Sequence, residues 1–322
     1  MFERIFSFLF MLILNITSVL GLPFDAYESK QLFNDTCFDN GFYIVSQKAV
    51  NNSVVKIGEF KFNDNSANPY WHIAQWNSGP CLWADKAESD EYTITDGLTK
   101  WVTYNRDEKS VSMRLNAVNV YKGLPAGDEA WPHLLLEQSP ICDYNSLSEY
   151  DKSFYNCSAD RMVVELSIRI NDFVDTTNTD GINAVQYLAY FYMSDVQGKN
   201  FMWFGLNLFD NRGYQDEYWS LDKASNCMIY SVSTKDTFGG KYNSLYRNGK
   251  PYLSDEWVKV KIDLKPFIAK AIKNANESNT FGEAVSADDF YISGTNIGFE
   301  IHGNYDCTAE IKDFSLTSYN KK

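Results

Sequence analysis

Long apolar runs are missing from this 322-residue sequence beyond residue 21. A membrane-spanning helix needs about 20 apolar residues in succession, so we expect no membrane insertion by the rest of the chain. Basic residues are also scarce, because 29 Lys and Arg stand against 42 Asp and Glu, for a net charge of −13. An acidic chain without basic clusters is a poor partner for nucleic acid or other polyanions.

Several catalytic and metal-binding motifs are absent as well. The sequence has no CxxC pair, no GxSxG and no glycine-rich phosphate loop, which disfavours thiolate zinc sites, esterase-type triads and nucleotide binding. Its three histidines, His72, His133 and His302, are far apart. A zinc site made from them would have to assemble from three distant segments, so we expect no metal.

The first 21 residues have the pattern of a secretory signal peptide. Arg4 precedes an apolar run over residues 5–14, and small or compact residues at 17–21 fit cleavage before Leu22. A membrane anchor is the alternative, but Asn15 interrupts the run before it reaches spanning length. We therefore expect a secreted, extracellular protein whose mature chain begins at Leu22.

The cysteine content agrees with export. Six cysteines lie in the mature part, namely Cys37, Cys81, Cys142, Cys157, Cys227 and Cys307. An even number in an exported chain predicts up to three disulfide bonds, whose pairing the spacing does not decide. Glycosylation acceptor triplets begin at Asn34, Asn51, Asn156 and Asn276, which suggests a glycoprotein if the host is a eukaryote.

Period-two alternation dominates the chain and predicts β-strands. The clearest alternating runs cover residues 111–115, 164–170, 258–264 and 297–301. One segment differs, because apolar residues recur at helical spacing after Pro266, which predicts a short helix over 266–275. With no repeat and no linker, we expect an all-β fold: a single antiparallel β-sandwich or jelly roll over residues 22–322, with this one helix.

Candidate site residues follow from the side of each strand that lies opposite its apolar face. Trp203 and Asn207 lie opposite Met202, Phe204, Leu206 and Leu208; His133 and Glu137 lie opposite Leu134 and Leu136; Glu300 and His302 share a third such face. Residues 70–76 offer either Trp71 with Gln75 or His72 with Trp76, and alternation does not decide between them. Such mixtures suit sugars, since indoles stack on pyranose rings and polar groups bond the hydroxyls.

Two of these residues are carboxylates, and they raise the possibility of catalysis. Glu137 and Glu300 would be the acid and the nucleophile or base of a glycoside hydrolase if their carboxyl groups lay about 5–5.5 Å or 6.5–9.5 Å apart. A separate acidic segment, residues 172–181, could bind a structural Ca²⁺ through Asp172, Asp175, Asn178 and Asp180. Its composition is equally that of a solvated turn, which we prefer.

The stretches Trp257–Leu264, Asn296–Asn304 and Ala309–Leu316 carry a resemblance to a known superfamily. The first stretch, which leads into the predicted helix, and the closing strand pair formed by the other two resemble the concanavalin A-like lectins and glucanases, whose jelly rolls bind glycans on a concave sheet. The ExDxxE triplet of the laminarinase-like members is absent here, so the resemblance transfers no catalytic residue.

The leading hypothesis is therefore a secreted, lectin-like protein that recognises neutral glycans in an aromatic and polar groove. The alternative is a glycoside hydrolase or polysaccharide lyase acting in the same groove. A structural or adhesive surface protein without a small-ligand groove is the third possibility.

Overall fold

The computed structural model describes residues 26–47, 54–62, 67–82, 88–89, 92–122, 131–177, 182–222, 225–240, 245–247 and 250–322. Residues 1–21, expected to form the signal peptide, lie outside this part of the chain. Among the described residues, no helix combines the length and the apolar character that crossing a membrane would require.

One layer of the fold is an eight-stranded antiparallel sheet in the order β17-β10-β19-β8-β7-β6-β5, with β1 also paired to β19. Its strands are β1 (Tyr27–Gln31), β5 (Glu88–Ser89), β6 (Thr93–Thr95), β7 (Lys100–Asn105), β8 (Ser110–Asn116), β10 (Arg161–Asp175), β17 (Val258–Asp263) and β19 (Tyr305–Lys321).

The other layer is a nine-stranded mixed sheet in the order β13-β14-β12-β11-β18-β9-β4-β2-β3. Its strands are β2 (Phe42–Val45), β3 (Lys56–Phe60), β4 (Trp71–Ala74), β9 (His133–Gln138), β11 (Ala184–Asp195), β12 (Phe201–Asp210), β13 (Tyr218–Asp222), β14 (Cys227–Val232) and β18 (Phe290–His302). The pairs β2·β4 and β12·β14 are parallel and the others antiparallel. A separate short pair joins β15 (Tyr246–Arg247) to β16 (Lys250–Pro251).

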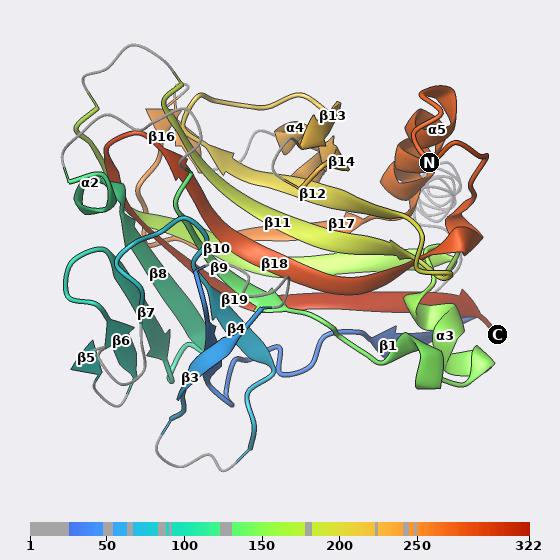
Figure 1. Ribbon diagram of the computed structural model, residues 1–322, viewed down its shortest axis with the longest axis horizontal. Coiled ribbons are helices and arrows are strands. Elements are labelled where there is room, and N and C mark those ends of the chain that lie inside the picture. The colour runs from blue at the N-terminus through green and yellow to red at the C-terminus, as the bar shows by residue number, and fades with distance from the viewer. Residues whose placement is uncertain are drawn as a thin grey trace, which may run out of the picture.

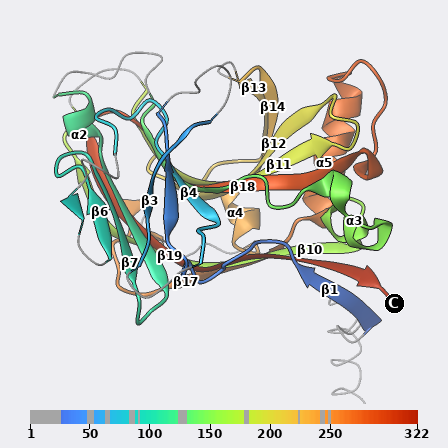
Figure 2. The same ribbon diagram turned by 60° about the horizontal axis from the view of Figure 1, so that its bottom comes forward.

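Figure 2 shows these sheets as two layers, with β11, β12 and β18 in one and β10, β17 and β19 in the other. Apolar side chains from both sheets fill the space between them, as expected for a sandwich. Aromatic rings join the layers, because Trp71 of one sheet packs 5.8 Å from Phe314 of the other, centroid to centroid. The predicted β-sandwich is confirmed, and so are its four alternating strands.

The predicted helix is also confirmed, as α5 (Lys265–Glu277), with Pro266 in its first turn and Ile268, Ala271, Ile272 and Ala275 buried. The expectation of a single helix was wrong. The described chain also contains α2 (Ala117–Val120), α3 (Glu149–Tyr155), α4 (Thr234–Thr237) and the 3₁₀ turns η2 (Tyr144–Ser146) and η3 (Ala287–Asp289). All five are only one or two turns long, too short to show a helical period. Figures 1 and 2 show α3 and α5 at the end of the sandwich where the C-terminus lies.

The predicted disulfides are not formed, because all six cysteines are free thiols. Cys157 and Cys307 are fully buried, and burial raises the pKa of Cys157 to about 12. The even number of cysteines therefore did not indicate disulfide bonds in this chain. The glycosylation acceptors that the structure describes use their amide nitrogens internally: Asn34 bonds Gln138, Asn156 bonds Asp288 and Asn276 bonds Val285.

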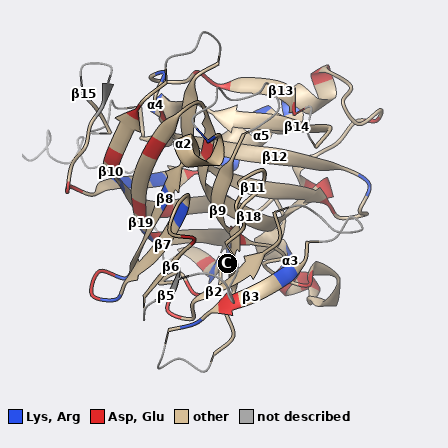
Figure 3. Ribbon diagram, turned by 60° about the vertical axis from the view of Figure 1, so that its left-hand side comes forward, with Lys and Arg blue, Asp and Glu red and all other residues tan. Residues whose placement is uncertain are grey.

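Charges on the outer side of the eight-stranded sheet are paired across neighbouring strands; Figure 3 marks the charged positions along β10 and β19. Arg169 lies 2.6 Å from Glu310, and Arg114 lies 2.6 Å from Asp306. The guanidinium groups also lie over Trp257 and Trp101, each 4.2 Å from the ring centroid. These cations are thus already neutralised within the fold.

Candidate functional site

Each strand of the nine-stranded sheet turns alternate side chains into the sandwich and the others to the opposite side, here called the site face. On β12, Met202, Phe204 and Leu206 belong to the core. Trp203, Gly205 and Asn207 therefore lie on the site face, as the sequence predicted.

A first polar row crosses four adjacent strands of the site face. His72 of β4 lies opposite Glu137 of β9. Glu137 lies in turn opposite Asn296 of β18, which lies opposite Tyr190 of β11. Strands stand about 4.8 Å apart in a sheet, so these four side chains are lateral neighbours although they come from distant parts of the sequence.

Glu137 is held at the centre of this row by a short hydrogen-bond relay. The amide of Asn296 donates to the hydroxyl oxygen of Tyr192 over 3.1 Å, and the Tyr192 hydroxyl bonds the Glu137 carboxyl. Burial raises the pKa of Glu137, and the bond from Tyr192 offsets only part of that rise. Glu137 therefore keeps its proton to a higher pH than a glutamate in water does.

His72 borders Glu137 as a neutral group. Burial lowers the pKa of its imidazole, and the nearby Lys56 ammonium lowers it further. Its ring lies 5.6 Å from that of Tyr43 on β2. A neutral imidazole both donates and accepts one hydrogen bond, which suits a hydroxyl-bearing ligand.

A second polar row crosses the site face from β9 to β12. His133 lies opposite Glu300, with 4.0 Å between His133 Nε2 and Glu300 Oε2. Glu300 lies opposite Gln186, whose amide donates to Asp210 over 3.0 Å. Arg212 holds the fully buried Asp210 carboxylate with two hydrogen bonds of 2.8 and 2.6 Å.

The two rows separate Glu137 from Glu300. Glu300 is paired with His133, which lies four residues before Glu137 on β9. At about 3.4 Å per residue and 4.8 Å between strands, their Cα atoms lie about 14 Å apart. Side chains stand roughly perpendicular to a sheet, so this spacing exceeds both carboxyl separations of glycosidases. The register argues against the two glutamates acting as one catalytic pair.

Apolar residues form a strip between the polar rows. Ala74 lies opposite Leu135, Leu135 opposite Gly298, and Gly298 opposite Leu188. Trp76 packs against the cluster that Ala74 and Leu135 of this strip form with Val45, and it stays half-exposed.

An aromatic cluster surrounds Trp203 on the site face of β12. Its ring makes edge contacts with Tyr192 at 4.8 Å and with Phe201 at 4.9 Å, between ring centroids. The indole N–H donates to Ser225 over 3.0 Å, while the side chain remains half-exposed. Trp203 is thus held by its edge, which fixes the plane of the indole.

Three buried polar atoms of the site face have no hydrogen-bond partner within the described part of the chain. They are Nδ1 of His133, Oδ1 of Asn207 and Oδ1 of Asn296. Buried polar groups in folded proteins are nearly always hydrogen-bonded. Asn207 and Asn296 are 0% and 6% exposed, so their oxygens lie beneath the surface, where an ordered water rather than a surface ligand would reach them.

The structure resolves the alternative that alternation left open at β4. Trp71 is fully buried in the core, where its indole N–H donates to the backbone oxygen of Asp35. Gln75 is also fully buried and bonds Val45 and Leu82. Neither reaches the site face, so their proposed ligand roles are wrong, and His72 with Trp76 is the pair that lies there.

The remaining sequence candidates are less central. His302 is 6% exposed, with Nδ1 2.5 Å from the backbone oxygen of Ile182 and its ring 5.1 Å from Trp131. Among the described residues no group of three His, Cys, Asp or Glu is placed to hold a metal. Of the suggested calcium ligands, Asn178 and Asp180 lie outside the described residues, and Asp172 and Asp175 accept from the backbone of Phe173 and Thr177.

Sequence reasoning missed Tyr190, Tyr192, Gln186 and Asn296. On β11 both faces are apolar or aromatic, so alternation does not show which tyrosines leave the core. The glycines provide a usable signal. A Cβ at Gly205 would meet Tyr190 at 2.6 Å, and one at Gly294 would meet Tyr192 at 2.5 Å. Each glycine leaves space for a tyrosine ring on the adjacent strand.

Comparison with known proteins gives fold-level similarity only. No family model matches the chain, and no curated protein does. Solved structures with a similar fold include the endoglucanase Cel12A from Rhodothermus marinus, with TM-score 0.36 and 10% identity over 71% of this chain and 92% of that one. A family 12 xyloglucanase from Bacillus licheniformis has TM-score 0.38 and 11% identity over 78% and 94%.

A third similar structure is the xyloglucanase domain of NopAA, a type three effector from Sinorhizobium fredii, with TM-score 0.36 and 11% identity over 72% of this chain and 96% of that one. What the structure itself shows of the predicted resemblance is the architecture, two β-sheets packed face to face around one apolar core.

Proposed function

We propose that the chain binds a neutral polysaccharide on the site face of its nine-stranded sheet. The observation that carries the proposal is that two half-exposed indoles, Trp76 and Trp203, share one face with half-exposed polar groups, those of His72, His133, Glu137 and Glu300. A sugar hydroxyl both donates and accepts, so a glycan satisfies imidazole nitrogens and carboxyl groups alike.

The apolar groups of the same face support this proposal. The half-exposed Trp203 and Trp76 provide aromatic surfaces, and a pyranose ring stacks its C–H face on an indole. Polar rows run on both sides of the strip on which Trp76 packs. A sugar ring placed there would direct hydroxyls toward Glu137 on one side and Glu300 on the other.

The charge of the site favours a neutral ligand. Glu137 and Glu300 lie within the rows, and Arg212 is already bound by Asp210 through two hydrogen bonds. An anionic sugar would face carboxylates without a compensating cation among these residues. We therefore expect neutral glycans to bind better than uronic acid polymers.

Cleavage of a glycosidic bond is the second candidate function, and the raised pKa of Glu137 favours it. A general acid must keep its proton at the working pH. Glu137 meets that requirement, whereas the register removes Glu300 as its direct partner. This candidate predicts release of reducing ends that Glu137→Gln abolishes while binding is retained.

The test is titration calorimetry of the protein with soluble β-glucan, xyloglucan, mannan and polyuronate. We expect binding to at least one neutral polymer and its loss on Trp203→Ala. Trp101→Ala is the matched control, because Trp101 lies on the outer side of the other sheet against Arg114. Absence of binding to all three neutral polymers, or equal loss in both variants, would refute the proposal.

A further inference from the structure

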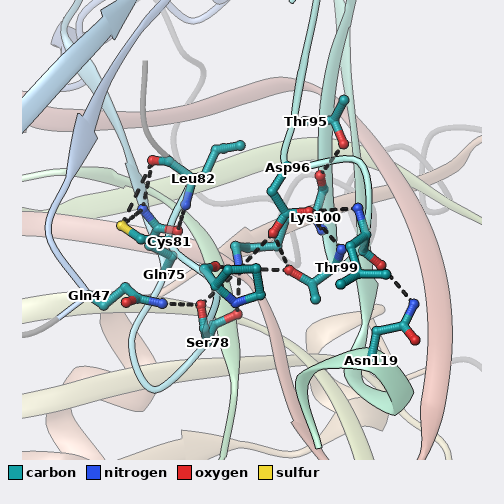
Figure 4. A network of polar contacts seen from close by, with 12 residues as sticks. Gln47, Gln75, Ser78, Cys81, Leu82, Thr95, Asp96, Thr99, Lys100 and Asn119 are labelled. Carbon is teal, nitrogen blue, oxygen red and sulfur yellow. Dashed lines mark hydrogen bonds and ion pairs between the residues drawn. The ribbon is translucent and has the colours of Figure 1, made fainter. Parts of the chain in front are cut away.

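Lys100, the first residue of β7, is fully buried, which is rare for lysine. Its ammonium group donates to the backbone oxygens of Ser78 at 2.8 Å and Pro80 at 2.5 Å. It also donates to the hydroxyl groups of Ser78 and Thr99 and lies 3.4 Å from Asp96 Oδ2. Figure 4 shows these contacts converging on the lysine nitrogen.

Asp96 is fixed in place as the counter-ion. Its Oδ1 accepts from the backbone N–H groups of Leu98, Thr99 and Lys100, and Oδ2 accepts from the Thr99 hydroxyl. Burial alone would raise the pKa of Asp96, but these hydrogen bonds outweigh it and lower the pKa. The titratable groups that face Lys100 are Asp96 and Cys81.

Three of the four hydrogen-bond acceptors of Lys100 belong to the loop of residues 75–82, which follows β4 in the other sheet. Gln75 ties the two ends of this loop together, since its side chain bonds the backbone N–H and oxygen of Leu82. Lys100 holds the middle of the loop at Ser78 and Pro80. A lysine of one sheet thus fixes a loop of the other.

Trp76 lies in this loop and connects it to the candidate site. Its backbone oxygen accepts from the N–H of His133 over 2.8 Å. Its side chain packs against the cluster of Val45, Ala74 and Leu135, of which the last two belong to the apolar strip between the polar rows. The position of the loop therefore determines the position of the Trp76 indole, one of the two aromatic surfaces of the site face.

We propose that Lys100 is a positioning residue of the site face, which holds the 75–82 loop so that Trp76 lies in place for the ligand. This inference rests on the proposed glycan binding for its functional part. Burying an ammonium group costs free energy that its hydrogen bonds must offset. An apolar side chain would be enough if the position only had to be filled. Without Lys100, the backbone oxygen of Pro80 loses its charged donor, and such bonds are among the stronger ones in proteins.

The first arm of the test needs no ligand. Tryptophan is replaced by 5-fluorotryptophan, and the ¹⁹F resonance of Trp76 is assigned through Trp76→Phe. We expect Lys100→Met to shift or broaden that resonance, whereas Lys261→Met, at a lysine 59% exposed in its side chain, leaves it unchanged. An unchanged Trp76 resonance in Lys100→Met would overturn the proposal. If Lys100→Met does not fold, Asp96→Asn tests the same contact with the same expected shift.

The second arm measures the affinity for soluble xyloglucan and β-glucan. Lys100→Met should weaken binding by about tenfold, the size of a lost charged hydrogen bond. If Lys100 acts through Trp76, this loss disappears in a Trp76→Phe background and persists in a Trp203→Phe background. An equal loss in both backgrounds would contradict a positioning role. Failure of the wild-type chain to bind would instead count against the proposed function, and the ¹⁹F arm would still decide the role of Lys100.

Discussion

Gly205 lies directly beneath the ring of Tyr190, so that a Cβ at position 205 would come within 2.6 Å of Tyr190 Cε1. The two residues are neighbours on β12 and β11. The missing side chain leaves room for the ring, and the Tyr190 hydroxyl thereby reaches that of Tyr218 on β13. A residue with no side chain thus shapes the site face.

Gly205→Ala should accordingly destabilise the chain by about 1–3 kcal/mol, the usual cost of overpacking. Urea denaturation would measure the loss. In a Tyr190→Ala background the same substitution should cost far less, because the clashing ring is gone. A cost that is equal in the two backgrounds would contradict the packing described here.

Glu137→Gln should change the pH dependence of stability. The folded chain raises the pKa of Glu137, so between the ordinary value and the raised one the folded state binds more protons than the unfolded state. The stability of the wild type then falls as pH rises through that window. Glutamine does not titrate, so thermal unfolding should show the stability of Glu137→Gln rising relative to that of the wild type from pH 4 toward pH 7. Parallel curves would show that the carboxyl is not buried in this way.

The contribution of Lys100 to the pH dependence of stability has the opposite sign. Burial, partly offset by Asp96, lowers its pKa from 10.5 to about 8. Above pH 8 the unfolded chain therefore holds a proton that the folded chain has lost, and stability rises with pH. Relative to Lys100→Met, the wild type should gain about 1 kcal/mol between pH 8 and pH 9, measured by urea denaturation. A constant difference over this range would place the pKa of Lys100 at its ordinary value.

The thiols offer a direct chemical check. Denaturation without reductant, followed by N-ethylmaleimide and intact-mass measurement, should give adducts on all six cysteines. In the native protein, Cys157 and Cys307 should be protected, because both are fully buried and burial raises the pKa of each thiol. Fewer than six adducts in the denatured protein would reveal disulfide bonds.

The fold was accessible to sequence reasoning because a two-sheet sandwich imposes period two on its strands. The alternation around Val164 and Ile168 on β10 survives in the structure as one buried face. The pattern after Pro266 likewise became α5. Helix α3 could also have been found, since Ser148 caps it and Glu149 and Asp151 follow in its first turn.

The site was accessible only in part. Alternation placed Trp203, Asn207, His133 and Glu137 on the correct side, because their strands have one clearly apolar face. It could not choose between Trp71 and Trp76, since both residues are aromatic and the strand is only four residues long.

The pairing register between neighbouring strands could not be predicted from the sequence. That Glu137 lies beside Asn296, and Glu300 beside His133, depends on pairing between strands more than 150 residues apart in the chain. A shift of four residues would have placed the two glutamates opposite each other without changing either alternation pattern. The distance between two site residues on different strands therefore had to come from the structure.

The central claim is that the site face binds a neutral glycan, and calorimetric titration of β-glucan or xyloglucan into the wild type, Trp203→Ala and Trp101→Ala tests it most directly. We predict binding by the wild type, a loss of at least about tenfold in affinity for Trp203→Ala, as expected for a central aromatic contact, and no change for Trp101→Ala. Absence of wild-type binding, or full affinity in Trp203→Ala, would contradict the account.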